Sequence, residues 1–319
     1  MSLRKIGRDA ATPAHIPLAG WKDIALRVNR RIREDHLTTL AGSIAFFIFL
    51  SVFPGIGVVV SVYGLTFDPA QMNEQLTALS GFLPPGAVGL LTEQLWHLAG
   101  QGHTLSMGLV LGVLLMLWSA SRAMKASITA LNIVYQEIER RDFIRFNVAG
   151  VFLTVCVIAS FALVLSFIVA VPSLLGTLGL PVSVTTLTRV LRWPILGLFA
   201  AIGIALLYRH APNRKPAKLQ WVTWGSVLAT LLWLGISALF SHYVFYFGNF
   251  NEIYGSLGAV IILMLWLYLS ALSVLIGAEV NAAVEHQTAE DTTTGPPRPM
   301  GERGAYVADT LGESVETEQ

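Results

Sequence analysis

Residues 253–278 read IYGSLGAVIILMLWLYLSALSVLIGA, a run that contains no charged side chain. A bilayer core about 30 Å thick is crossed by about 20 apolar helical residues. Lipid cannot hydrogen-bond a free backbone, so a run this apolar is expected to cross the membrane as an α-helix. This stretch alone therefore predicts an integral membrane protein built from helices.

Five further stretches are almost as free of charge, and each is long enough for one crossing, with slight extension of the shorter ones. The sequence therefore predicts an all-α fold, a polytopic membrane bundle. Its six transmembrane helices are expected at about 40–64, 104–121, 147–171, 192–208, 221–247 and 254–278.

The composition of the chain agrees with this prediction. Hydrophobic residues make up 54% of the 319 residues and charged residues only 13%, with a mean hydropathy of +0.62. Soluble domains carry about 25% charged residues, so this chain cannot cover a water-exposed surface of its size. The composition excludes an ordinary soluble enzyme and a disordered chain, and the single cysteine, Cys156, excludes an intrachain disulfide.

The positive charges predict the orientation in the membrane. Of the 21 Lys and Arg residues, all but Arg189 and Arg192 fall in alternate segments. These segments are the first 39 residues, the loops after the second and fourth spans, and the C-terminal tail. Cytoplasmic segments carry the excess of Lys and Arg. Both termini are therefore expected in the cytoplasm.

The N-terminal segment divides into two parts. Residues 1–17 are expected to be a flexible N-terminus, and residues 18–284 the membrane domain. Within that domain, residues 18–37 place Trp21, Ile24 and Val28 at helical spacing, with basic side chains elsewhere on the helix. An apolar stripe beside a basic face is typical of a helix on an anionic membrane surface. The alternative is a helix that packs on the cytoplasmic loops.

Two more segments lie outside the predicted spans. Residues 65–103 carry only three charges and have helical apolar spacing on both sides of a Pro-Pro-Gly break, which predicts a helical loop resting on the outer face.

Residues 285–319 contain eight acidic and two basic residues and little apolar content. Such a composition cannot support a core, so a disordered acidic tail is expected.

The sequence lacks the common catalytic motifs. The sequence contains no GxxxxGK[ST] loop, no HExxH pair and no G-x-S-x-G elbow. It offers no clustered carboxylates or histidines of the kind that a metal-dependent nuclease needs. We therefore assign no catalytic, cofactor-binding or metal-ligating residue, and we expect a protein that is not an enzyme and binds no cofactor.

Polar residues near the span edges are the candidates for a functional or structural role. Arg122 and Glu279 end spans that run in the same direction, so their similar depth suggests an ion pair. The alternative is two separate interfacial charges. Asn132 and Asn281 are candidates for a polar cavity or for hydrogen bonds between helices. Pro54 interrupts the hydrogen bonds of the first span and is a candidate kink.

Several of these residues fall in motifs with a family resemblance. The chain resembles the YihY/BrkB family of bacterial inner-membrane proteins over about residues 20–285. The motifs are LAGSIAFF at 40–47 with LSVFP at 50–54, LWSASR at 117–122 with ALNIVY at 130–135, LYRHAP at 207–212, and IYGSLG at 253–258 with GAEVN at 277–281.

The resemblance implies six spans and a role in the bacterial envelope, linked to lipids or lipopolysaccharide precursors. The leading hypothesis is an inner-membrane protein of envelope maintenance that handles or transports such a lipid without ATP hydrolysis. The alternative is a structural scaffold without transport activity. A ribonuclease, after the family's historical label ribonuclease BN, ranks last. The expected partners are membrane lipids, with other envelope proteins or a second copy as further hypotheses, and no nucleic acid.

Overall fold

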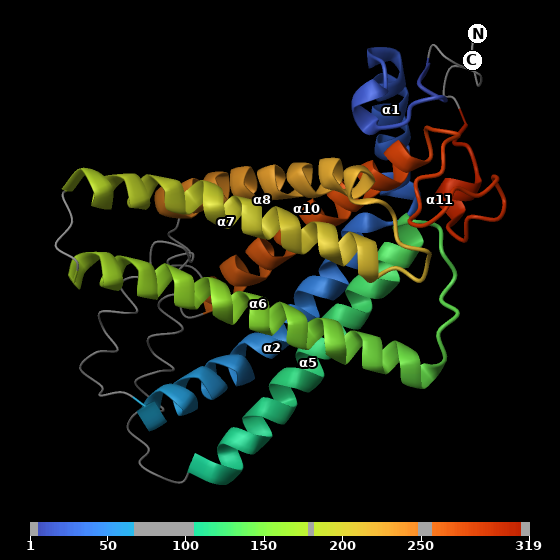
Figure 1. Cartoon of the computed structure of the whole chain (residues 1–319). Coiled ribbons are helices and arrows are strands. Elements are labelled where there is room, and N and C mark those ends of the chain that lie inside the picture. The colour runs from blue at the N-terminus through green and yellow to red at the C-terminus, as the bar shows by residue number, and fades with distance from the viewer. Residues whose placement is uncertain (1–5, 67–104, 178–181, 248–256, 314–319) are drawn as a thin grey trace.

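The computed structural model describes residues 6–66, 105–177, 182–247 and 257–313 (Figure 1). This part of the chain is helical and contains no strand beyond one isolated bridge between Ala217 and Thr293. The predicted all-α class is confirmed. The predicted outer-face loop at 65–103 lies almost wholly outside the described residues. The helices are η2 (Pro13–His15), α1 (Leu18–Glu34), α2 (Leu37–Thr66), α5 (Leu105–Val134), α6 (Phe143–Thr177), α7 (Val182–His210), α8 (Leu219–Phe247), α10 (Leu257–Glu285) and α11 (Tyr306–Asp309).

Each predicted span falls mostly within one long helix: α2, α5, α6, α7, α8 or α10. The bounds differ most at α5, which continues from the predicted end at 121 to Val134, and at α7, which begins at Val182 and not at 192. Four of these long helices contain a stretch long and apolar enough to cross a membrane. These stretches are Leu37–Val58, Phe143–Val164, Leu219–Val244 and Gly258–Glu285. A shorter apolar stretch, Pro194–His210, lies in α7, and α5 is not among the four. By length and composition, four of the described helices are therefore able to cross a membrane, which supports a membrane protein.

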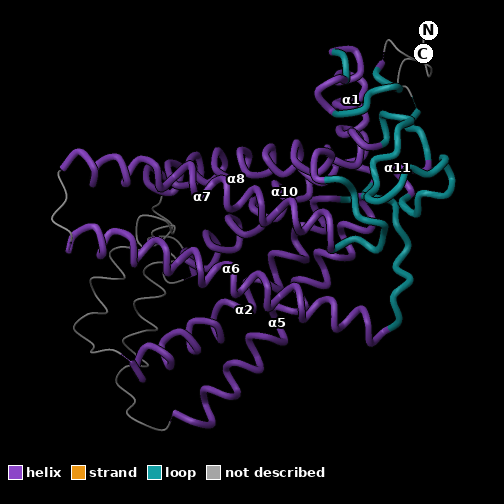
Figure 2. The backbone as a smooth tube through the Cα atoms, viewed as in Figure 1, coloured by secondary structure: helices purple, strands orange, loops and turns teal. Residues whose placement is uncertain are grey.

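The helices meet at one end of the bundle. There α1, the end of α10 and residues 286–313 come together, and the described loops gather at the same place (Figures 1 and 2). We call this the loop end. α2 packs along α5, α10 packs on both α8 and α2, and α6 contacts chiefly α5. Away from the loop end, the α2–α5 pair diverges from α7 and α8 (Figure 1).

The hydrophobic core lies toward the loop end. Its largest fully buried side chains come from α2, α5, α7, α8 and α10 and from the turn after α5, and they include Leu37, Ile128, Tyr135, Tyr208 and Leu275. By contrast, only 11% to 33% of each candidate membrane stretch is buried within the chain. The outward faces carry many exposed Leu, Val, Ile and Phe side chains, which is the surface expected of helices in contact with lipid.

A glycine contact brings α8 and α10 together. A Cβ atom at Gly225 would lie 2.1 Å from the carbonyl oxygen of Gly277, so the two backbones touch where both residues lack a side chain. One turn along α10, the buried Asn281 accepts a hydrogen bond from the Gly225 N–H at 2.7 Å and donates one to the Val222 carbonyl at 2.9 Å. Small residues and an interhelical amide are typical of helix packing in membranes.

The amphipathic helix predicted at 18–37 is present as α1. Its apolar side chains Ile24 and Val28 are buried against Trp221 of α8 and Val284 of α10. The sequence left open a helix on the membrane surface or one packed on the cytoplasmic loops. The structure shows the apolar face of α1 packed on α8 and α10 instead. Residues 6–17 also differ from the expected flexible N-terminus, because Ala10 and Ile16 join the same cluster.

The C-terminal segment differs most from its prediction. Residues 285–313 do not form a disordered tail, since Gln287, Thr288 and Thr292 are fully buried. Arg303 donates to four backbone carbonyls at 2.7 to 3.1 Å. Asp309 accepts from the N–H groups of a turn with two positive-φ glycines. Composition did not predict this order, because the segment contains few apolar residues. It is ordered by hydrogen bonds between its polar side chains and its own backbone.

The glycine contact between α8 and α10 yields a stability prediction. Gly225→Ala places a methyl group against the backbone of α10, so we expect a loss of about 1–3 kcal/mol in the free energy of unfolding. Gly235→Ala is the control on the same helix, because no atom lies within 4 Å of its added Cβ. Thermal unfolding in detergent measures both. Equal melting temperatures for the two variants would contradict the close packing.

Candidate functional site

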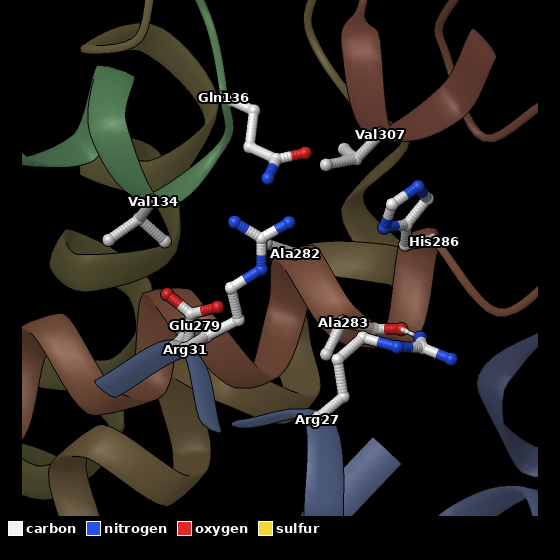
Figure 3. Close-up of a pocket in the computed structure, with 9 residues that line it drawn as sticks. All are labelled: Arg27, Arg31, Val134, Gln136, Glu279, Ala282, Ala283, His286 and Val307. Carbon is white, nitrogen blue, oxygen red and sulfur yellow. Dashed lines mark hydrogen bonds between the residues drawn. The ribbon is translucent and has the colours of Figure 1, made fainter. Parts of the chain in front are cut away.

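A small polar cavity lies at the loop end, between α1, the end of α5, α10 and the C-terminal segment (Figure 3). Its volume is about 10 Å³, enough for about one water molecule. The lining residues are Arg27, Arg31, Val134, Gln136, Glu279, Ala282, Ala283, His286 and Val307. We call this the polar cavity.

Glu279 is the buried acid of the polar cavity. Its side chain is 2% exposed, and its Oε2 atom has no hydrogen-bond partner. Arg31 of α1 and Gln136, which follows α5, line the same cavity (Figure 3). The amide of Gln136 faces the Arg31 guanidinium. A buried carboxyl with one unpartnered oxygen in a water-sized cavity can hold a water molecule or a proton.

Two carboxyl groups lie close to Arg31. The guanidinium lies 3.8 Å from a carboxyl oxygen of Glu34 and 3.8 Å from one of Asp35, in addition to lining the cavity with Glu279. Glu34 also lies 3.7 Å from Arg30. Burial raises the pKa of Asp35, the charge of Arg31 opposes the rise, and Glu34 adds to it. The charge of Arg31 is therefore shared with Glu34 and Asp35 and is not devoted to Glu279.

A buried ion pair lies beside the polar cavity. Arg214, in the loop after α7, donates to both carboxyl oxygens of Glu285 at 2.7 and 3.1 Å, and both side chains are fully buried. The guanidinium lies 4.1 Å from the centre of the Tyr135 ring, and Thr292 donates to Glu285 at 3.1 Å. Burial alone would lower the pKa of Arg214, but the charge of Glu285 raises it above its ordinary value.

Arg27 connects α1 to the C-terminal segment. Its guanidinium, 3% exposed, donates to Asp23 at 3.0 Å, to the Gln287 side chain at 2.9 Å and to the Ala283 carbonyl at 3.2 Å. Burial lowers the pKa of Arg27 to about 10, and Asp23 partly offsets the effect. Burial likewise lowers the pKa of the neighbouring His286 to about 4, and nearby arginines add to this. His286 is therefore neutral near pH 7.

Asn132 joins three segments at the loop end. It donates to Glu139 at 2.9 Å and accepts from the Asn213 N–H at 2.8 Å. Glu139 also pairs with Arg141 at 2.7 Å. The amide therefore ties the end of α5 to the loops before α6 and after α7, as the hydrogen-bonding role proposed from the sequence requires.

The proposed ion pair between Arg122 and Glu279 is wrong. Arg122 is exposed on α5 and lies 5.3 Å from the centre of the Trp118 ring, whereas Glu279 faces the polar cavity. Similar depth was not enough, because the two side chains leave their helices in different directions. Three of the four polar candidates, Asn132, Glu279 and Asn281, therefore lie at the loop end. The fourth, Arg122, does not lie with them.

Pro54 lies within α2, which continues through it to Thr66. Proline has no N–H, so the carbonyl four residues earlier, at Leu50, has no helical partner. The carbonyl of Pro54 faces α5, where a Cβ at Gly112 would lie 4.0 Å away. The kink itself stays a prediction.

Several residues of the site were not singled out from the sequence. Arg214 was counted only as a cytoplasmic charge, and Glu285 was assigned to the tail. No local signal pairs two residues 71 positions apart. Arg27 and Arg31 were recognised only as part of a basic face. Among the described residues, no group of three or more His, Cys, Asp or Glu side chains could hold a metal ion.

The buried ion pair predicts a large and specific stability effect. Arg214→Met leaves the Glu285 charge buried without a partner, so the free energy of unfolding should fall by about 3–5 kcal/mol. Arg214→Met combined with Glu285→Leu removes both charges and should cost less than Arg214→Met alone. Arg145→Gln is the control, because Arg145 is 81% exposed and lies 3.8 Å from Asp142. A double variant as unstable as the sum of both single variants would contradict the coupling.

Comparison with known proteins identifies the family. The family model described as Virulence factor BrkB matches residues 28–301. The "Putative ribonuclease-like protein YfkH" of Bacillus subtilis is 32% identical over 76% of this chain and 88% of its own length. UPF0761 membrane proteins of Tolumonas auensis and Photobacterium profundum are 28% and 29% identical, over 80% and 85% of this chain and 83% of each relative. No solved structure matches the chain significantly. The chain belongs to the Virulence factor BrkB family of membrane proteins.

Proposed function

We propose that this protein spans the bacterial inner membrane six times and acts in envelope maintenance by moving or exposing a lipid between leaflets, without ATP hydrolysis. Both termini lie in the cytoplasm in this proposal. Its substrate is an amphiphile of the bilayer or a lipopolysaccharide precursor. No protein partner is required for the basic activity.

The helix directions support the proposed topology. α2, α6 and α8 begin at the loop end, whereas α5, α7 and α10 finish there (Figure 1). The basic segments of the sequence fall at the loop end too, including α1 and the loops after α5 and α7. An excess of Lys and Arg on one side favours the cytoplasm for that side.

One observation carries the lipid-handling proposal. A shallow apolar depression on the surface of α5 is bordered by Leu111, Leu114, Leu115 and Trp118, with about 500 Å³ of space that is largely open to the surroundings. These side chains are 52% to 58% exposed, so no described residue covers them. We call it the α5 hollow. It lies on the helix pair that diverges from α7 and α8, where an acyl chain has access from the bilayer (Figure 1).

The scaffold hypothesis has support of its own. The polar cavity has room for about one water molecule, so no lipid headgroup fits in it. The loop end is instead consolidated by buried Arg, Asn and Thr hydrogen bonds. A rigid end of this kind suits a protein that holds envelope proteins or a second copy in place.

The ribonuclease hypothesis stays last. It rests on names alone: the family's historical label and the name of the Bacillus subtilis relative, which describes that protein as ribonuclease-like. RNA cleavage by the purified protein, lost on substitution of a defined residue, is the result that would advance it.

Labelling of introduced cysteines tests the topology. In a Cys156→Ser background, Ser2→Cys and Ser314→Cys should react with a membrane-impermeant maleimide only in inverted vesicles. Ser80→Cys, in the predicted outer loop, should react in intact spheroplasts. Labelling of Ser2→Cys in intact spheroplasts would overturn the orientation that the positive charges favour.

A liposome assay tests lipid movement. Purified protein in vesicles that contain a fluorescent phospholipid should expose inner-leaflet probe to an external chemical quencher, and no ATP is needed. Leu111→Gln with Leu115→Gln should slow this at least severalfold, because polar groups in the α5 hollow disfavour an acyl chain.

The matched control is Leu198→Gln with Leu206→Gln, two exposed leucines of α7. This variant should move lipid at the unmodified rate. Vesicles that stay inert with folded protein would favour the scaffold instead.

A further inference from the structure

We propose that the α5 hollow, together with Arg122 and Lys125, forms a binding site for an anionic glycerophospholipid, with one acyl chain in the hollow and the phosphate at the two cations. The physiological role of this site rests on the proposed function, because a lipid-binding site is useful to a protein that moves lipid. The binding itself is testable without any transport.

The cationic end of the site is joined directly to the apolar hollow. The Arg122 guanidinium lies 5.3 Å from the centre of the Trp118 ring, and Trp118 lines the hollow. Leu111, Leu115, Trp118 and Arg122 follow one another at spacings of three and four residues, so they share one face of α5. The apolar part of this face therefore borders directly on a positive charge. A lipid with an acyl chain on the apolar part would place its headgroup at that charge.

Lys125 adds a second cation one turn further along. Its Nζ donates to the Asn147 side chain of α6 at 2.8 Å. Its aliphatic stem runs against α6 at Gly150, where an added Cβ would lie 2.7 Å from the Lys125 Cγ. The ammonium group is thus held between α5 and α6 by a neutral amide, and its position is fixed by packing.

No acid neutralises this pair of cations. Within the described ranges, neither Arg122 nor Lys125 forms an ion pair with an Asp or Glu. Partial burial lowers the pKa of Lys125, and the positive charge of Arg122 lowers it further. Two adjacent positive charges without a counterion favour an anionic ligand, and a phosphate diester supplies one.

The dimensions fit one leaflet. Leu111 and Arg122 are eleven residues apart, which in an α-helix is about 16 Å along the axis. Half of a hydrocarbon core of about 30 Å is about 15 Å. With Arg122 at headgroup depth, the α5 hollow covers the rise of about 10 Å from Leu111 to Trp118. It therefore lies within a single leaflet and can contact part of an acyl chain.

Charge complementarity selects this occupant among membrane components. A zwitterionic lipid also presents a phosphate, but its own ammonium group cancels that charge and weakens the attraction to the two cations, and an apolar helix of another protein offers nothing to them. Each Lys or Arg near an anionic lipid surface contributes to binding, so the two together should give phosphatidylglycerol roughly a tenfold preference over phosphatidylcholine.

Quenching of Trp118 by brominated phospholipids tests the site. The full-length protein is reconstituted with phosphatidylcholine and increasing phosphatidylglycerol, the latter brominated in its acyl chains. The Trp118 contribution is the fluorescence difference between each protein and its Trp118→Phe version. We expect half-maximal quenching at roughly tenfold less brominated phosphatidylglycerol than brominated phosphatidylcholine.

Arg122→Gln with Lys125→Gln should abolish this preference. Arg140→Gln with Arg145→Gln removes the same charge from exposed positions on the neighbouring loop and α6, and should retain the preference. Thermal unfolding of both double variants checks that they fold.

Leu114→Gln, which leaves the charges in place, should weaken quenching by both lipids. Equal quenching by the two lipids in the unmodified protein, or a preference that survives loss of Arg122 and Lys125, would overturn the site.

The same preparations separate the site from the proposed function. A preference for phosphatidylglycerol with no transbilayer movement leaves the binding site standing and contradicts lipid transport. Transbilayer movement with equal quenching by both lipids contradicts the site and leaves transport standing.

Discussion

The buried Arg214–Glu285 pair is the interaction on which the loop end depends. It joins the loop after α7 to the last residue of α10, with Tyr135, which follows α5, against the guanidinium and Thr292 of the C-terminal segment bound to the carboxylate. Removing two charges from water is costly, and a hydrophobic replacement is often as stable. We infer that the pair serves chiefly to fix which segments meet there.

This constraint explains the division of the bundle into two regions. Lipid is as apolar as leucine, so helices in a membrane gain little from hydrophobic burial and associate through small residues and hydrogen bonds. Here several such contacts, from Gly225 against Gly277 to the bonds of Asn132 and Asn281, lie toward the loop end. Two further bonds between α8 and α10, Trp233 to Ser270 and Trp266 to Ser237, lie farther along the helices. The rest of the long helices keep apolar exposed faces, and the α5 hollow belongs to that region.

The sequence predicted the long helices well because runs without charge have few alternatives in lipid. Most of the run at 253–278 lies in α10 (Leu257–Glu285), which continues about two turns past the end of the run. The hydrogen-bonding role of Asn132 and Asn281 also followed from residue type and position. The order of residues 285–313 did not, because it depends on single polar bonds such as Arg303 to the Ala308 carbonyl, which composition does not record.

Arg122 and Glu279 show why depth along a helix is insufficient for pairing. An α-helix turns about 100° per residue, so two charges at one level meet only if their helices also present the right faces. The α1 helix, placed on α10 by Ile24 and Val28, supplies Arg31 to the cavity that Glu279 lines. Glu279 faces that cavity, whereas Arg122 lies beside Trp118 and forms no ion pair among the described residues. The positive charge beside the α5 hollow therefore depends on which face of α5 carries Arg122, and not on its depth alone.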